Sequence, residues 1–339
     1  MKTKLFKASL FVLGGFFLLL TSCNESKKES LDLIQIRGEA QGTTYSILYY
    51  TNSDEELKTA IDSVLDKIDN SLSNWVSSSL ISELNRAELS KFSLRDTFGF
   101  LSDMLSASER FYEQSEGAFD PSVLPLVNAW GFGLSKRAEV DSSQIDSLMN
   151  FVGMNRLQFE MKASHLTIEK PIETKLDFNA IAQGYSADVL AEFLESKNIR
   201  SYMIELGGEM RLGDPKPMAE LWKVGIDKPM NPEEGREMQK VLELANKSIA
   251  TSGSYRKFYE LNGQRYSHTI NPLLGYPVQH NLLSASVIAN SAADADALAT
   301  ICMVLGLEKS KEYIAKLDQE VEVYLIYQAE NGELKSYQN

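Results

Sequence analysis

The sequence predicts an α+β fold with mixed, largely antiparallel sheets flanked by helices. Several pairs of segments alternate between apolar and polar residues and are joined by short turns rich in glycine and asparagine, which is typical of β-hairpins. Segments with helical periodicity lie between these pairs, but hairpins outnumber strand–helix–strand units. Beyond the N-terminal segment, the sequence contains neither an internal repeat nor a linker that would divide the chain.

The N-terminal segment has the features of a lipoprotein signal peptide. The basic stretch "MKTKLFK" precedes the apolar run "ASLFVLGGFFLLL", which is short for a membrane span and typical of a signal-peptide core. Small residues then lead to Cys23, as expected where lipid is attached before cleavage ahead of a cysteine. We therefore expect a signal peptide over residues 1–22, lipidation of Cys23, a tether over residues 23–33 and one domain over residues 34–339. An ordinary secretory signal with an incidental cysteine is the alternative.

A lipid anchor predicts a protein held on the extracytoplasmic, periplasmic side of either the inner or the outer membrane. The net charge of −13 argues against a nucleic-acid partner, because proteins that follow phosphates carry a basic stripe. Cys302 is the only other cysteine, so we expect no disulfide within the mature chain. Stability must then come from a buried core.

The first half of the domain begins with two strands and two helices. "LIQIRGEAQGTTYSILYY" alternates like a strand pair with Gly42 at the turn. Residues 53–72 form an amphipathic helix, whose start matches the capping-box spacing of Ser53 and Glu56. A second helix runs over residues 98–117 and ends at Gly117.

The second half mixes hairpins and helices. Residues 157–170 resemble a hairpin, residues 182–198 a helix, and residues 200–214 a buried strand that breaks at Gly207 and Gly208. Further hairpins are expected to turn at Asn262-Gly263 and Asn331-Gly332. A helix begins at Ser291, with Asp294 three residues on.

This last helix carries a candidate metal site. Asp296 and Thr300 are four residues apart and share a helical face, and their oxygens are suited to Mg²⁺. Alternatively, Asp294 and Asp296 only favour the helix N-terminus while Thr300 packs. Asp177 precedes a loop that enters another helix near Gln183; such an entry can hold a phosphate, and a loop carbonyl can complete a metal shell. Simple N-capping by Asp177 is the alternative.

Three aromatic or basic features are further candidates. The stretch "GAFDPSVLPLVNAWGFG" is a long loop that is either functional or a surface loop pinned by Trp130. Trp75 either lies in the core or stacks on a flat ring. His268 is either a general base or a structural histidine of its hairpin.

Taken in order, these segments resemble the ApbE family, the FAD:protein FMN transferases, over nearly the whole mature chain. The segments that carry the resemblance are "QGTTYSI", "LSNW", "GAFDPSVLPLVNAWGFG", "LDFNAIAQGYSADVL", "IELGGEM", "SIATSGSYRKF", "SHTINPLLGYPVQHN" and "ADADALATICMVLG".

The resemblance implies that FAD is the substrate, bound in a cleft, and that its FMN moiety moves onto a Thr or Ser hydroxyl of an acceptor protein. The reaction would need Mg²⁺, form a phosphoester-linked flavin and release AMP. The implied catalytic base is His268. The implied metal ligands are Asp296, Thr300 and the backbone carbonyl of Ala180, and the implied FAD contacts are Gln41, Trp75, Ala118, Phe119, Asp120, Asp177, Gln183 and Ile270.

The chain departs from the family pattern at three positions. Gln183 stands where lysine or glutamate is common, Ala299 where aspartate often precedes the metal-binding threonine, and Asn271 where aspartate usually precedes the proline. The first affects the charge of an FAD contact, and the other two affect metal affinity or a second metal site.

Two alternatives to the transferase stay open. With water in place of the protein hydroxyl, the same site would be an FAD pyrophosphatase that yields FMN and AMP. A flavin-binding lipoprotein without catalysis is the other, although a pure binder would not need His268, Asp296 and Thr300. Acceptors in this family include flavin-bearing subunits of sodium- or proton-linked redox complexes.

Overall fold

The computed structural model describes residues 31–134, 141–230, 235, 237–254, 258–261 and 264–339. The expected signal peptide, Cys23, most of the tether and the Asn262-Gly263 turn therefore lie outside the described residues. Strand β1 begins at Asp32, two residues before the expected start of the domain. Within the described residues, no helix combines the length and apolar character needed to cross a membrane.

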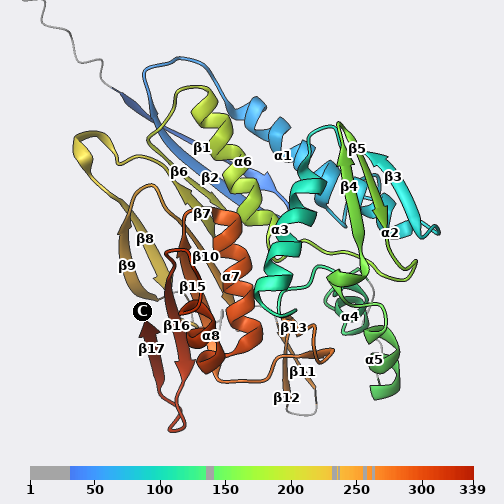
Figure 1. The fold of residues 1–339 in the computed structure, drawn as a ribbon. Coiled ribbons are helices and arrows are strands. Elements are labelled where there is room, and N and C mark those ends of the chain that lie inside the picture. The colour runs from blue at the N-terminus through green and yellow to red at the C-terminus, as the bar shows by residue number, and fades with distance from the viewer. Residues whose placement is uncertain (1–30, 135–140, 231–234, 236, 255–257, 262–263) are drawn as a thin grey trace, which may run out of the picture. The chain divides into compact units, whose positions relative to one another are not determined.

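An antiparallel sheet of eight strands forms the centre of residues 31–339 (Figure 1). The strand order is β1-β2-β6-β7-β10-β15-β16-β17, and each neighbouring pair is antiparallel. The bounds are Asp32–Ala40 for β1, Thr43–Thr51 for β2, Tyr202–Leu206 for β6, Glu209–Leu212 for β7, Ser248–Gly253 for β10, Leu282–Ala289 for β15, Glu322–Gln328 for β16 and Leu334–Gln338 for β17.

Helices α6 and α7 lie side by side on one face of this sheet (Figure 1). Helix α7 is buried over nearly its whole length, including Cys302, because its sequence is apolar on almost every side. Among the described residues the longest helices are α1 (Lys58–Leu72), α3 (Phe100–Gln114), α6 (Ala182–Ser196) and α7 (Ala292–Leu305), and the shorter α8 (Leu307–Ile314) directly follows α7.

Smaller elements surround the main sheet. A three-stranded sheet of order β3-β5-β4 contains β3 (Lys91–Arg95), β4 (Gln158–Lys162) and β5 (His165–Glu169). Paired short strands are β8 (Trp222–Asp227) with β9 (Met238–Leu244), β11 (Phe258–Leu261) with β12 (Gln264–Ser267), and β13 (Ile270–Asn271) with β14 (Tyr276–Pro277). The short helices are α2 (Leu80–Arg86), α4 (Leu124–Ala129) and α5 (Ser142–Met149), and the 3₁₀ turns are η1 (Met154–Arg156) and η2 (Pro217–Ala219).

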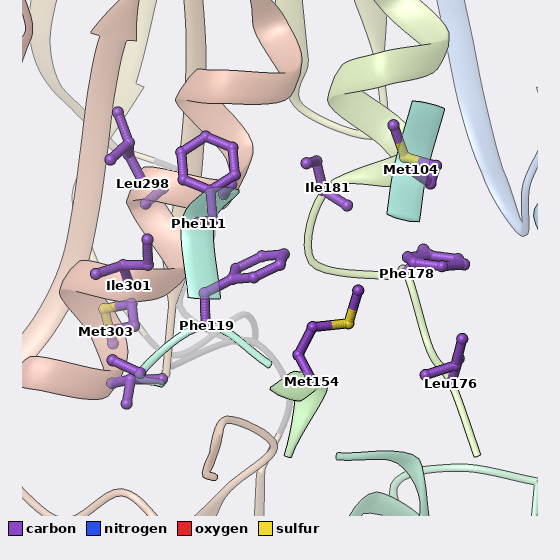
Figure 2. Packing of buried hydrophobic residues seen from close by; sticks show 14 of the residues in the cluster. Met104, Phe111, Phe119, Met154, Leu176, Phe178, Ile181, Leu298, Ile301 and Met303 are labelled. Atoms are coloured by element: carbon purple, nitrogen blue, oxygen red, sulfur yellow. The ribbon is translucent and has the colours of Figure 1, made fainter. Parts of the chain in front are cut away.

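The main core cluster joins α7 to loops that are distant in sequence (Figure 2). Phe119 lies between Leu298 and Ile301 of α7 on one side and the loop with Phe178 and Ile181 on the other. Burial of such large apolar side chains stabilises a fold by about 1.5–3 kcal/mol each. This packing fixes the loops before α4 and α6 against α7.

The predicted hairpins and helices within the described residues are confirmed, with one shift of a helix start. The expectation that residues 117–133 form a long loop was wrong in part, because α4 (Leu124–Ala129) lies within them. Ser291 is the N-cap of α7 and its hydroxyl accepts from the Asp294 amide at 3.1 Å, as expected. The capping box expected at Ser53 was wrong, because α1 begins at Lys58 with Leu57 as its N-cap. The Ser53 hydroxyl instead accepts from the Glu55 amide at 3.2 Å, which forms a local turn.

Candidate active site

The side chain of Asp296 connects α7 to the first turn of α6. Its Oδ2 atom accepts a hydrogen bond from the Gly184 amide at 3.1 Å. Gly184 lies in the first turn of α6, where backbone amides have no acceptor within the helix, so Asp296 supplies one. The Ala180 carbonyl precedes the N-cap Ile181 and so lies outside the hydrogen-bond ladder of α6.

Thr300 follows Asp296 by one turn and lies on the same face of α7. Its hydroxyl is 3.3 Å from that of Ser252 at the end of β10. A carboxylate, a threonine hydroxyl and a loop carbonyl are hard oxygen ligands of the kind that Mg²⁺ accepts alongside water and phosphate. Among the described residues no group of three or more His, Cys, Asp and Glu side chains forms a metal cluster. A metal site here would therefore rely on carboxylate, hydroxyl and carbonyl oxygens together.

Burial raises the pKa of Asp296 to about 7, and the hydrogen bond from Gly184 opposes this shift only in part. A cation bound beside a buried carboxylate stabilises its ionised form, because the opposite charge compensates for the lost hydration. The residues present therefore fit a divalent cation, with Asp296 as the charged ligand.

Asp294, two residues earlier, has a different environment. Its Oδ1 atom is 2.6 Å from Nη2 of Arg110 on α3. Asp294 thus contacts α3, whereas Asp296 contacts α6.

Asp177 is held in a network of amide side chains. Its carboxylate accepts from the backbone and side chain of Asn179 at 2.9 and 3.2 Å. Asn74 and Asn85 each donate to the Leu176 carbonyl, at 3.1 and 2.8 Å. Burial raises the pKa of Asp177, against the hydrogen bonds from Asn179 and Asn74. The N-capping alternative is wrong, because α6 begins at Ala182 with Ile181 as its N-cap.

The segment before α4 runs beside the Asp177 segment, since the Asp177 amide donates to the Pro121 carbonyl at 2.7 Å. The side chains of Ala118 and Phe119 are buried in the core, so an FAD contact from either would come from its main chain. The buried Asp120 carboxylate accepts from Ser122 and from the Met154 amide. Burial raises the pKa of Asp120 to about 6, which these bonds counteract in part.

The loop after α4 is attached to the turn that follows His268. Trp130 donates through Nε1 to the Gly275 carbonyl at 2.9 Å. The rings of Phe132 and His268 lie 6.4 Å apart and meet edge to face. Ile270 is buried in a cluster with Leu126 of α4. Trp130 thus pins the segment after α4 to the β13–β14 turn, and the candidate base His268 lies just before β13.

Gln41 and Gln183 both lie near the N-terminal part of α6. Nε2 of Gln41, in the turn between β1 and β2, donates to the Ser186 hydroxyl at 2.7 Å. Gly207 lies beside Nε2 of Gln183 and has a φ of +69°, a backbone conformation that favours glycine. Trp75 is 67% exposed, which removes its core alternative.

A model of the ApbE family matches residues 41–325. The chain belongs to the ApbE family. Curated relatives described as FAD:protein FMN transferase include those of Haemophilus influenzae and Escherichia coli, each 32% identical to this chain. The first alignment covers 93% of this chain and 91% of the relative, and the second covers 96% and 92%.

Solved structures of ApbE proteins are similar to this chain and confirm its α+β fold class. Flavin Transferase ApbE from Vibrio cholerae has a TM-score of 0.79 at 30% identity, covering 91% of this chain and 97% of that one. The apo form of Pseudomonas stutzeri flavinyl transferase ApbE has a TM-score of 0.79 at 27% identity, covering 91% and 95%.

In this ApbE chain, the candidate residues fall into groups. Asp296 and Thr300 lie on α7, and Asp296 contacts the first turn of α6, which Ala180 precedes. Asp120 and Asp177 lie on adjoining segments, and Trp75 directly follows Asn74 of the Asp177 network. His268 and Ile270 belong to the element attached to the loop after α4.

Sequence reasoning missed Asn85, Ser252 and Asp188. Asn85 bonds to both backbone groups of Leu176, beside Asp177. Ser252 lies in "SIATSGSYRKF", one of the segments that carry the family resemblance, so the sequence contained a signal for it. Asp188 lies one turn after Gly184 in "AQGYSADVL", but its partner segment is more than 100 residues away, so no local pattern marks its role.

Proposed function

We propose that this ApbE chain transfers the FMN moiety of FAD to a Thr or Ser hydroxyl of an acceptor protein. The acceptor oxygen would bond to the FMN phosphorus, the pyrophosphate bond would break, and AMP would leave. The observation that carries this proposal is the bond from Gly184 to Asp296, because it places a buried carboxylate at the entry of α6 in a family member.

Asp296, Thr300 and the Ala180 carbonyl would hold Mg²⁺. When bound, the ion would neutralise the reacting pyrophosphate and help to align it for in-line displacement. The proposal is supported by the burial of Asp296 and by its contact with the first turn of α6.

His268 would accept the proton of the acceptor hydroxyl. Thr and Ser hydroxyls are weak nucleophiles at neutral pH, so a positioned base accelerates their attack. Phe132 supports one edge of the imidazole, and Trp130 fixes the turn that follows it. AMP is a stable anion, so its departure needs little acid assistance.

FAD would contact Gln41, Asp177 and Gln183, together with the main chain of residues 118–120 and the Ile270 segment. Trp75 would stack on or beside the isoalloxazine ring, which its exposed indole permits.

The acceptor would be a flavin-bearing subunit of a membrane redox complex. We also propose that Cys23 carries a lipid that holds the protein on the extracytoplasmic side of the membrane, as the "LTSC" sequence indicates.

The testing experiment incubates the protein with FAD, Mg²⁺ and an acceptor protein, and analyses all products by mass spectrometry. The proposal predicts acceptor protein enlarged by FMN, with one AMP per FMN transferred. Free FMN with AMP and an unmodified acceptor would indicate a pyrophosphatase instead. Unchanged FAD would indicate a flavin-binding protein without catalysis. A parallel reaction with excess chelator tests the requirement for metal.

A further inference from the structure

We infer that Asp188 is a positioning residue that sets Asp296 in place for metal binding, an inference that rests on the metal site of the proposed function. Asp188 is on α6, and both of its carboxylate oxygens reach the beginning of α7. Oδ1 accepts from the Ala292 amide and Oδ2 from the Ala293 amide, each at 2.9 Å.

These two amides belong to the first turn of α7, where backbone donors have no partner within the helix. Ser291 satisfies the amide of Asp294, so Asp188 supplies acceptors for the two amides that precede it. The first turn of α7 is thus capped partly by its own Ser291 and partly by a side chain from another helix.

The relationship between the two helices is reciprocal. Asp188 of α6 caps the first turn of α7, while Asp296 of α7 accepts from Gly184 in the first turn of α6. Gly184 and Asp188 are one turn apart on α6, and Ala292 and Asp296 are one turn apart on α7. Two carboxylates therefore bridge the same helix pair.

The helices are in very close contact between these two bridges. A methyl group on Gly184 would stand 2.2 Å from the Ala292 carbonyl oxygen, which is shorter than any real contact of this kind. Asp188 itself is held from the other side, because Arg211 lies with Nε 3.7 Å from Oδ1 and also donates to the Asn290 carbonyl. The start of α7 is therefore fixed from two directions.

Asp296 lies one turn beyond the capped amides, so the position of its carboxylate follows the start of α7. Loss of the Asp188 cap would let this first turn shift or fray, and the Asp296 carboxylate would lose its alignment with the α6 entry. The main effect should be on metal affinity, since Asp188 contacts the backbone of α7 and acts through Asp296.

The test compares Asp188→Asn with Glu192→Gln, which removes the same charge from an exposed position one turn further along α6. An asparagine keeps one acceptor oxygen, but its amide nitrogen cannot accept from the second backbone amide. Mn²⁺ binding is titrated calorimetrically on the full chain in the presence of FAD. We expect Asp188→Asn to bind Mn²⁺ about 10–100-fold more weakly, the usual cost of losing a group that orients a metal ligand, and Glu192→Gln to match the wild type.

FAD affinity in chelator and thermal unfolding of each variant separate positioning from general damage. A merely structural residue would lower FAD affinity and thermal stability without a selective loss of Mn²⁺ affinity. If Asp188→Asn fails to fold, Arg211→Gln is the second variant. We expect Arg211→Gln to weaken Mn²⁺ binding too, but by a smaller factor.

The outcomes distinguish this inference from the proposed function. Wild-type Mn²⁺ affinity in folded Asp188→Asn, or in Arg211→Gln where the first variant is unfolded, overturns the inference and leaves the transferase intact. A wild-type protein that binds no Mn²⁺ and transfers no FMN overturns the proposed function, and the inference with it.

Discussion

Arg110 on α3 and Asp294 on α7 form an ion pair in which Nη2 and Oδ1 are 2.6 Å apart. Asp296, two residues further on, instead meets the backbone of Gly184. Neighbouring carboxylates on one helix therefore have different partners, and mutation can separate their roles.

We expect Asp296→Asn to lower transfer activity roughly 10²-fold or more, because the charge stabilisation that a bound metal supplies is worth several kcal/mol. Asp294→Asn removes only a partly exposed ion pair, worth about 0.2–1 kcal/mol of stability, so its activity should stay near that of the wild type. The measurement is the transfer rate over a range of Mg²⁺ concentrations. Equal losses in the two variants would contradict the assignment.

Trp75→Ala should weaken FAD binding by about 2–10-fold, since aromatic stacking adds about 0.5–1.5 kcal/mol beyond area burial. The fold should be little affected, because the indole is 67% exposed. FAD affinity is measured by fluorescence quenching, and turnover should persist at saturating FAD. Phe98→Ala is the control, because Phe98 is also an exposed aromatic residue. An unchanged dissociation constant in Trp75→Ala would count against stacking.

His268→Asn should slow transfer by about 10²–10⁴-fold while FAD and metal still bind, which is the usual contribution of a positioned general base. The wild-type rate should rise with pH through a histidine titration, because only a neutral imidazole accepts a proton. AMP release and FAD affinity are measured on the same folded variant.

His165→Asn is the control for this substitution, since His165 is exposed in β5. Intact binding with a rate close to that of the wild type in His268→Asn would exclude His268 as the base. Asp177 would then become the candidate.

Lys170 should make stability depend on pH in the alkaline range. Its Nζ atom donates to the carbonyls of Thr174, Pro171 and Ile172, at 2.8, 3.3 and 3.4 Å. Burial lowers the pKa of Lys170 to about 8, below its ordinary 10.5. The unfolded chain therefore holds this proton more tightly than the folded chain between these two values, so the contribution of Lys170 to folding stability rises with pH there.

The matched comparison is between the wild type and Lys170→Met, in urea unfolding from about pH 7 to about pH 11. The wild type should gain on the order of 3 kcal/mol relative to the variant over this range, at about 1.36 kcal/mol per pKa unit. Parallel curves for the two proteins would show that the Lys170 pKa is not lowered.

Cys23→Ala should abolish lipid attachment and leave the protein unprocessed or released from the membrane. The measurement is membrane fractionation combined with mass analysis of the mature N-terminus. Cys302→Ala serves as the control, and it should be processed and retained like the wild type. Normal processing and membrane retention of Cys23→Ala would refute the lipid anchor.

The hairpins and helix interiors could be predicted because their signals are local. The Asn331-Gly332 turn and the breaks at Gly207 and Gly208 each join adjacent strands, as their residue types indicate. The start of α1 was mispredicted because Ser53 forms a turn of its own rather than a helix cap. The Ser53 hydroxyl could either cap a helix or close a local turn, and packing of the following residues favoured the turn.

The sequence indicates candidate residues for the site but not the contacts between them. The spacing of Asp296 and Thr300 indicated a shared face, whereas the contact from Asp296 to Gly184 joins residues 112 positions apart. The cap from Asp188 to Ala292 spans 104 positions. Such contacts depend on strand order in the main sheet, which no local pattern specifies.

The buried thiol of Cys302 offers a natural reporter of motion in α7. Burial raises its pKa to about 12, so the thiol stays protonated and shielded in the folded protein. An alkylating reagent can therefore modify it only during excursions that lift α7 from the sheet. Since Cys302 lies two residues after Thr300, its labelling rate in a chain lacking Cys23 would time the opening of the same helix that carries the proposed metal ligands.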